Sequence, residues 1–140
     1  MKKILSAVMV IFMVMSLTSC QKSYDELQTS ANAHAKEVYT AVQAAIDEDP
    51  SLRLDKYYVS NYGDGYVKVS FDGSTSTDLS PWLGNKFEGY FVAVIDSYSR
   101  TVEYALWSDH EIDLDYYDYV EYTDRAYYEG TGHAIGYFGY

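Results

Sequence analysis

Residues 23–50 read SYDELQTSANAHAKEVYTAVQAAIDEDP, and this stretch decides the fold. Its apolar residues recur every three or four positions, which is the spacing of one face of an α-helix. They are Leu27, Ala31, Ala35, Val38, Val42, Ala45 and Ile46. Pro50 ends the pattern, because proline disfavours helical geometry in the residue before it. We therefore expect one long helix over residues 22–49, with His34 as a boundary residue beside a narrow, alanine-rich face.

Beyond Pro50 the apolar spacing changes to every second residue, which is typical of β-strands. We predict strands over residues 52–60 and 66–71, a polar loop over 72–78 and one helical turn over 80–84. The clearest signal is a hairpin over residues 89–109, with an apolar strand (90–95), a turn (97–100) and an alternating strand (101–107). A β meander is therefore expected over residues 52–109.

Together these elements predict the α+β fold class, with one long N-terminal helix packed on an antiparallel sheet of four or five strands. We expect Val38, Val42 and Ile46 to pack against the two strands of the hairpin. Residues 130–140 are rich in glycine and aromatic residues. They form either a loose tail or a last strand at the sheet edge.

The first 20 residues combine lysines at positions 2 and 3, a run over residues 4–15 that is apolar except for Ser6, and a final cysteine. The run is shorter than the ~20 residues that a membrane-spanning helix needs. The order basic, apolar, small is that of a secretory signal, and Leu17-Thr18-Ser19-Cys20 resembles a bacterial lipobox. The resemblance implies removal of residues 1–19, diacylglycerol on the Cys20 sulfur and often acylation, as by palmitate, of the new amino group. An uncleaved membrane anchor and a plain secretory signal are the alternatives.

On this interpretation, residues 20–140 form a single extracytoplasmic domain, held at the cell membrane by the lipid on Cys20. In a Gram-negative source the outer membrane would hold it. Cys20 is the only cysteine, so packing rather than a disulfide must stabilise the domain. Residues 1–19 carry two lysines and no acid, so their removal takes the formal charge from −11 to −13. Such a charge repels phosphate, and we expect no nucleic-acid partner.

The C-terminal segment, residues 110–140, is acidic and rich in tyrosine, and its acidic run begins at Asp109. Its candidate binding residues are Asp109, Glu111, Asp113, Asp115, Tyr116, Tyr117 and Tyr119. Carboxylates suit calcium, but Leu114 and Val120 stand where an EF-hand loop needs glycine and glutamate. We therefore interpret the acids as a solvated edge and expect no metal site. The alternative is a ligand-binding role for residues 109–129, with calcium or a glycan as the ligand, since tyrosine rings suit glycan or protein partners.

Three stretches carry a family resemblance. Residues 31–43 (ANAHAKEVYTAVQ) resemble the middle of the helix in pilin-like proteins of Gram-positive gut bacteria. Residues 89–96 (GYFVAVID) and 102–108 (VEYALWS) are similar to the hairpin of their heads. A long helix followed by an antiparallel meander is also the plan of type IV pilins and pseudopilins. The resemblance implies a pilin-like head that serves in surface interaction, adhesion or assembly, with a protein or glycan partner and no cofactor.

Two sequence features bear on filaments and on catalysis. Filament-forming pilins resembling this chain begin with an apolar shaft of about 20 residues, and here Lys2, Lys3 and the lipobox stand in its place. The resemblance therefore implies a head on a lipid anchor. No serine lies in a Gly-x-Ser-x-Gly pattern, and Cys20 would be acylated. We therefore predict that the protein is not an enzyme.

Overall fold

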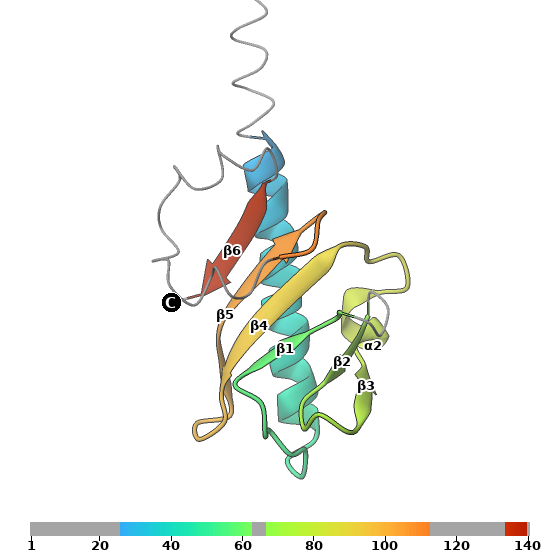
Figure 1. Ribbon diagram of the computed structural model, residues 1–140, viewed down its shortest axis with the longest axis vertical. Coiled ribbons are helices and arrows are strands. Elements are labelled where there is room, and N and C mark those ends of the chain that lie inside the picture. Colours follow the sequence, from blue (N-terminus) through green and yellow to red (C-terminus); the bar gives the residue numbers. More distant parts are fainter. Residues whose placement is uncertain (1–25, 63–66, 113–133, 140) are drawn as a thin grey trace, which may run out of the picture.

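The structure, a computed structural model, describes residues 26–62, 67–112 and 134–139. The long helix α1 covers residues 26–48, and α2 (Ser80–Leu83) is a single turn. The strands are β1 (Tyr58–Ser60), β2 (Lys68–Ser70), β3 (Ser76–Asp78), β4 (Tyr90–Asp96), β5 (Thr101–Ser108) and β6 (Ile135–Gly139). An antiparallel sheet has the order β1-β4-β5-β6, and β2 pairs with β3 in a second small sheet (Figure 1). The predicted α+β fold class is confirmed.

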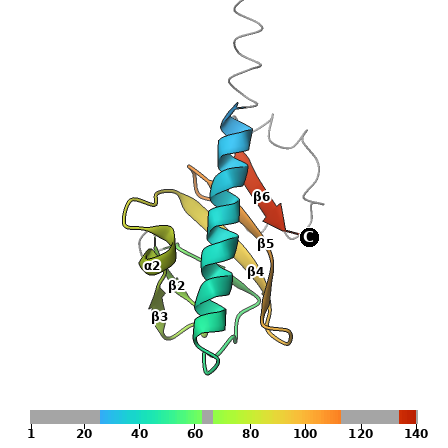
Figure 2. The ribbon, with the colours of Figure 1, turned by 180° about the vertical axis from the view of Figure 1, so that it is seen from behind.

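Helix α1 lies along one face of the four-stranded sheet, as the view from behind shows (Figure 2). Its apolar stripe forms the main core: Val38, Val42 and Ile46 are at most 1% exposed. They share a cluster with Phe91, Ala93 and Ile95 of β4 and with Val102 and Ala105 of β5. The predicted packing of the helix on the hairpin is therefore confirmed, and burial of these side chains stabilises the head by about 1.5–3 kcal/mol for each large aliphatic residue.

The predicted apolar stripe is wrong at one residue, Leu27, which is not buried. Leu27 is 57% exposed, although Ala31, one turn later, is buried. The physical reason is the length of the sheet: the Gln28 side chain already donates a hydrogen bond (2.8 Å) to the carbonyl of Ile135, the first residue of β6. Leu27 therefore lies at the margin of the described sheet, where the described strands leave its side chain exposed.

Amide side chains of α1 bind the sheet at both of its ends. The Asn32 Oδ1 accepts a 3.0 Å hydrogen bond from the backbone amide of Tyr137 in β6. At the other end, the Gln43 Oε1 accepts from the Val102 amide (2.8 Å), and its Nε2 donates to the Arg100 carbonyl (3.2 Å). These bonds satisfy strand groups at the sheet margin and fix α1 against the hairpin turn.

Of the two expectations for residues 130–140, the last strand is confirmed. Residues 135–139 form β6 at the sheet edge, where it pairs with β5. Gly136 makes the closest approach to the helix, because a Cβ placed there would overlap the carbonyl of Ala31. A glycine in β6 and an alanine in α1 therefore let two backbones meet. This small-residue contact explains why the N-terminal half of the stripe is alanine-rich.

The strands before residue 80 are shorter than predicted, and one was missed. In the predicted strand over 52–60, only β1 pairs with β4, while the amides of Asp55 and Lys56 both donate to the Phe71 carbonyl. The predicted loop over 72–78 is wrong in its second half, since Ser76–Asp78 form β3 and Thr77 pairs with Val69. Its polar residues gave no apolar alternation to detect.

The short strand β3 forms because of the turn that precedes it. Asp72 Oδ1 accepts hydrogen bonds from the backbone amides of Ser74 (2.8 Å) and Thr75 (2.7 Å). These bonds reverse the chain and place the following residues beside β2. The predicted helical turn over 80–84 is confirmed as α2, which has Pro81 in its first turn and Gly84 after its end.

The sheet face away from α1 carries a second, smaller apolar cluster. Its buried members are Val92, Leu106, Ile112 and Ile135, with Tyr62, Tyr104 and Tyr137 packed against them. Apolar residues therefore alternate onto both faces of β4, as predicted for a central strand. Within the described ranges, none of the helices combines the length and hydrophobicity that a membrane span requires.

Candidate functional site

A groove of about 880 Å³ opens between three parts of the head. Helix α1 contributes His34 and Glu37, the segment 83–90 contributes the opposite side, and the end of β5 contributes Trp107 and Asp109. In Figure 1, the segment 83–90 is the long connection from α2 to β4. The volume lies within the ~300–1,000 Å³ that is typical of small-molecule sites. We refer to this feature as the aromatic groove.

The wall of the aromatic groove is a chain of ring contacts. The ring centroid of His34 lies 4.4 Å from that of Trp107 and 6.1 Å from that of Phe87, the latter edge to face. Phe87 in turn contacts Phe91 of the main core at 6.0 Å, also edge to face. Because Phe87 is only 7% exposed, the wall is anchored in the core and is held rigid at its inner end.

Two glycines shape the segment that faces this wall. Gly84 (φ 78°) follows α2, and its amide donates to the Ser80 carbonyl, which ends the helical turn. Gly89 (φ 104°) packs on the indole of Trp107, where a Cβ would overlap the ring. The Trp107 Nε1 donates a 3.0 Å hydrogen bond to the carbonyl of Glu88. The indole is therefore fixed by its own strand, by His34 and by the segment opposite.

The polar groups of the aromatic groove include both donors and acceptors. The His34 Nδ1 lies 3.3 Å from Glu37 Oε2, one turn further along α1. Lys86, Glu88 and Asp109 are further members of the lining. In the described part of the chain, no three His, Cys, Asp or Glu side chains are arranged to hold a metal ion. The lining residues offer hydrogen-bonding groups, charges and ring contacts.

The structure places two of the predicted binding residues and separates them. Asp109 lies at the rim of the aromatic groove, with its Oδ1 2.9 Å from the His110 Nδ1. Glu111 is exposed and is not part of the lining. Strand β5 ends at Ser108, so neither residue continues it. The other candidates, Asp113, Asp115, Tyr116, Tyr117 and Tyr119, lie outside the described residues, as does Cys20.

Sequence reasoning missed most of the aromatic groove. His34 was interpreted as a boundary residue, and the segment 84–89 received no role. The available signals were weak: a histidine beside the apolar stripe, a tryptophan near the end of a strand, and a six-residue connection bounded by glycines at 84 and 89. None of these gives the spacing of a motif, because the three parts meet only when α1 packs on the sheet.

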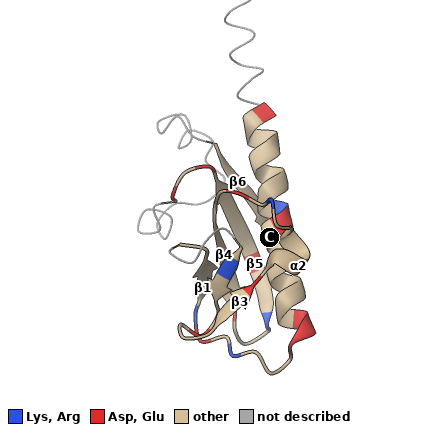
Figure 3. Ribbon diagram, turned by 90° about the vertical axis from the view of Figure 1, so that its right-hand side faces the viewer, with Lys and Arg blue, Asp and Glu red and all other residues tan. Residues whose placement is uncertain are grey.

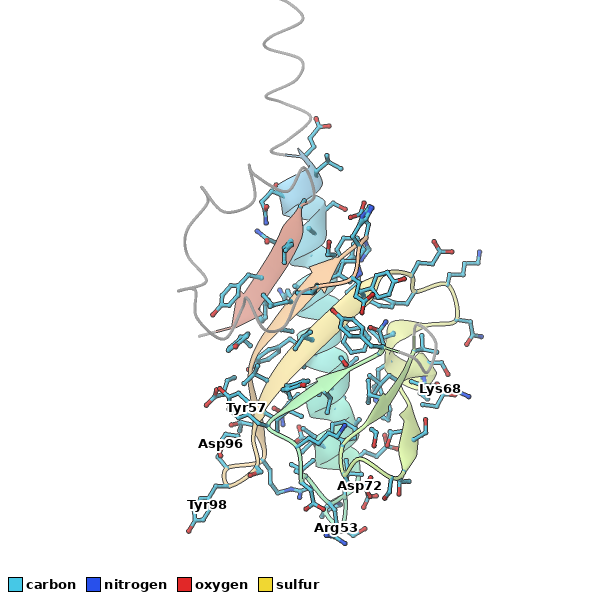
Figure 4. The ribbon with its side chains drawn as sticks, viewed as in Figure 1. Arg53, Tyr57, Lys68, Asp72, Asp96 and Tyr98 are labelled. Carbon is cyan, nitrogen blue, oxygen red and sulfur yellow. The ribbon has the colours of Figure 1, made fainter. Side chains whose placement is uncertain are left out.

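The shifted pKa values lie at turns and not in the aromatic groove. Hydrogen bonds from the Ser99 hydroxyl and from the amides of Tyr98 and Ser99 lower the pKa of the Asp96 carboxyl. Amides at Thr75 and Ser74 hold the pKa of Asp72 well below its usual range. Serine hydroxyl and amide donors do the same for Asp49, and the Ser80 amide does so for Asp78. These acids organise turns, and Figure 4 labels two of them, Asp72 and Asp96.

Comparison with known proteins gives no relative: no protein-family model, no curated protein and no solved structure matches this chain. The function must therefore be argued from the sequence and from the geometry of the head.

Proposed function

We propose that this protein is a non-enzymatic, lipid-anchored protein of the cell envelope, whose pilin-like head serves in surface interaction, adhesion or assembly. The head would be tethered at the extracytoplasmic face of the cell membrane through the lipid on Cys20. The lipobox-like Leu17-Thr18-Ser19-Cys20 supports the anchor. The single structural observation that supports the head is the helix laid along the antiparallel sheet, with the β4–β5 hairpin beneath it.

The short sequence distance between Cys20 and the head fits this proposal. Helix α1 is described from residue 26, six positions after Cys20. The turn between β4 and β5 and the α1–β1 connection lie at the opposite end of the head (Figure 1). A short tether at one end would leave that far end and the sides of the head available to a partner.

The test of the anchor is a substitution at the lipidation site. Cys20→Ala should release the protein from the membrane fraction into the soluble fraction, because the diacylglycerol has no other thiol to which it could be attached. A matched control, Ser30→Ala in the exposed part of α1, should stay in the membrane fraction. Mass spectrometry of the wild-type protein should find the lipid on an N-terminal Cys20. Membrane retention of the Cys20→Ala protein would contradict the proposal.

A second candidate function is ligand binding, and the aromatic groove is the observation that favours it. The sequence placed this function in residues 109–129, and of the two predicted residues that the structure describes, Asp109 lines the groove and Glu111 does not. A binding role at the groove is compatible with the lipid anchor, because Cys20 and the groove are different parts of the chain.

A further inference from the structure

We propose that the aromatic groove binds a neutral saccharide. This inference rests on the proposed role in surface interaction, and it names the ligand class and the place of contact. It follows from three properties of the groove: its size, its mixture of hydrogen-bonding groups and its ring wall. Each of these properties belongs to described residues of the head.

The size and shape of the groove suit a small ligand better than a protein surface. Its volume of about 880 Å³ is in the range of cofactor and drug-sized sites, whereas protein partners bind across flat patches. It is lined by three separate elements, α1, the segment 83–90 and the end of β5. A ligand there would exchange part of its hydration for contacts with the lining, so it must bring hydrogen-bonding groups that match the polar side chains.

The lining suits hydroxyl groups, each of which donates one hydrogen bond and accepts others. Glu37 and Asp109 offer carboxylate acceptors, Lys86 offers an ammonium donor, and Asn85 offers both kinds of group. A ligand that carries only hydrogen-bond donors would offer no acceptor to the Lys86 ammonium. A ligand that carries only acceptors would place them against the carboxylates, which are acceptors themselves. A polyhydroxylated ligand satisfies both kinds of lining group.

Charge favours a neutral saccharide over an anionic one. The carboxylates of Glu37, Glu88 and Asp109 surround the groove, against the single ammonium of Lys86. The chain as a whole carries a formal charge of −11. Acidic residues are spread over the helix and the sheet layers of the head (Figure 3). An acidic sugar would therefore be repelled both by the lining and by the surrounding field.

The ring wall supplies the apolar contact that a sugar needs. A sugar ring has C–H groups that pack on aromatic surfaces, and the negative faces of those rings attract the slightly positive hydrogens. Trp107 is half-buried, and His34 has 37% of its side chain exposed. Because Trp107 is fixed by Glu88 and His34, the wall is preorganised, and binding requires little ordering of the protein.

The test is a titration of the full lipoprotein in micelles of a detergent without a sugar headgroup. The probes are cellobiose, maltose, lactose and di-N-acetylchitobiose. Binding is detected from the indole N–H signals in a nitrogen–proton NMR spectrum. The two tryptophans provide an internal control, since Trp107 lines the groove and Trp82 does not. We expect at least one probe to shift the Trp107 signal saturably at millimolar concentration or below, with Trp82 unchanged. A Trp82→Phe variant assigns the two signals.

Variants then locate the site without disturbing the core. Glu37→Ala should weaken the binding at least tenfold, and Asp109→Asn should also weaken it, because both residues are largely exposed acceptors of the lining. The matched control is Glu48→Ala, at an exposed position near the end of the same helix, and it should bind as the wild type does. No saturable shift with any of the four probes would overturn the inference. So would a shift that survives Glu37→Ala and Asp109→Asn together.

Failure of this inference and failure of the anchor are distinguishable. Membrane fractionation of Cys20→Ala reports only on the lipid, whereas the titration reports only on the groove. A lysine-containing tripeptide, titrated as a fifth probe, separates the ligand classes. If the tripeptide moves the Trp107 signal and the sugars do not, the ligand is a basic peptide and the saccharide assignment is wrong.

Discussion

The hydroxyl of Tyr62 and the backbone of Ile112 are joined by two hydrogen bonds. The hydroxyl donates to the Ile112 carbonyl (2.9 Å) and accepts from the Ile112 amide (2.7 Å). Tyr62 follows β1, and Ile112 follows β5, so one side chain ties together two segments that are 50 positions apart. It does so on the sheet face away from α1, where Ile112 is buried in the second apolar cluster.

Removal of this hydroxyl should destabilise the head. Tyr62→Phe keeps the ring but leaves the Ile112 amide and carbonyl without this partner in a partly buried site. A lost hydrogen bond of this kind costs about 1–3 kcal/mol, since the partner stays desolvated. Urea denaturation should show a lower midpoint with an unchanged slope. Tyr98→Phe is the control, because Tyr98 is 98% exposed and projects from the β4–β5 turn (Figure 4); equal losses in the two variants would contradict the prediction.

A single methyl group at Gly136 should detach part of β6. The Cβ of Gly136→Ala would overlap the carbonyl carbon and oxygen of Ala31 in α1. No side-chain rearrangement relieves an overlap with backbone, so the strand or the helix must shift, at a cost of about 1–3 kcal/mol or more. We expect faster amide hydrogen exchange for Tyr137, because its amide donates to the Asn32 Oδ1 of α1 and this bond depends on the close approach of β6 to the helix. Unchanged protection of this amide would show that the contact is looser than described.

The elements with a strong periodic pattern could be predicted from the sequence. The stripe through Val38, Val42 and Ile46 gave the helix and its buried face, because a 3.6-residue period identifies both at once. Residues 89–109 gave the central hairpin, because their apolar runs are long and bounded by polar turn residues. The fold class followed from these two elements alone.

The remaining elements depend on contacts that a periodic pattern does not carry. Strand β3 is polar and exists because Asp72 turns the chain back onto β2. The aromatic groove exists because α1 places His34 against Trp107, which is 73 positions later in the sequence. Such a pair has no local signal. Asp109 was predicted for its place in an acidic run, and it lines the groove for a different reason, its position just after β5.

The Asp96 turn should make stability depend on pH in the acidic range. Its folded pKa is lowered, first by the Ser99 hydroxyl and then by the amides of Tyr98 and Ser99. The charged form therefore stabilises the fold above the unfolded value of 3.8, and this contribution is lost as the pH falls below it. Asp96→Asn should thus lower the melting temperature at pH 7. Its deficit relative to the wild type should shrink between pH 4 and the acid limit.

Control measurements can separate this turn from general acid destabilisation. Asp47→Asn removes a carboxylate at the exposed end of α1, where the Asp47 Oδ1 accepts a 2.9 Å hydrogen bond from the Gln43 side-chain amide. We expect its melting temperature to follow the wild type across the same pH range. A constant deficit for Asp96→Asn at every pH would mean that the carboxylate charge contributes nothing and that only the side-chain shape matters.

The acidic run should not hold calcium tightly. Asp109, Glu111, Asp113 and Asp115 alternate along the sequence, and acids two apart on an extended chain are ~7 Å apart, from a rise of about 3.3 Å per residue. Calcium needs six to eight oxygens at about 2.3–2.6 Å, so only a tight loop could gather them. In the described part of the run, the Asp109 carboxylate lies beside His110, and the intervening Ile112 is buried in the second cluster. Isothermal titration of the protein with calcium at low salt should give only weak, non-saturating heats. One-to-one binding at micromolar affinity or tighter would instead establish calcium binding as the ligand function of this segment.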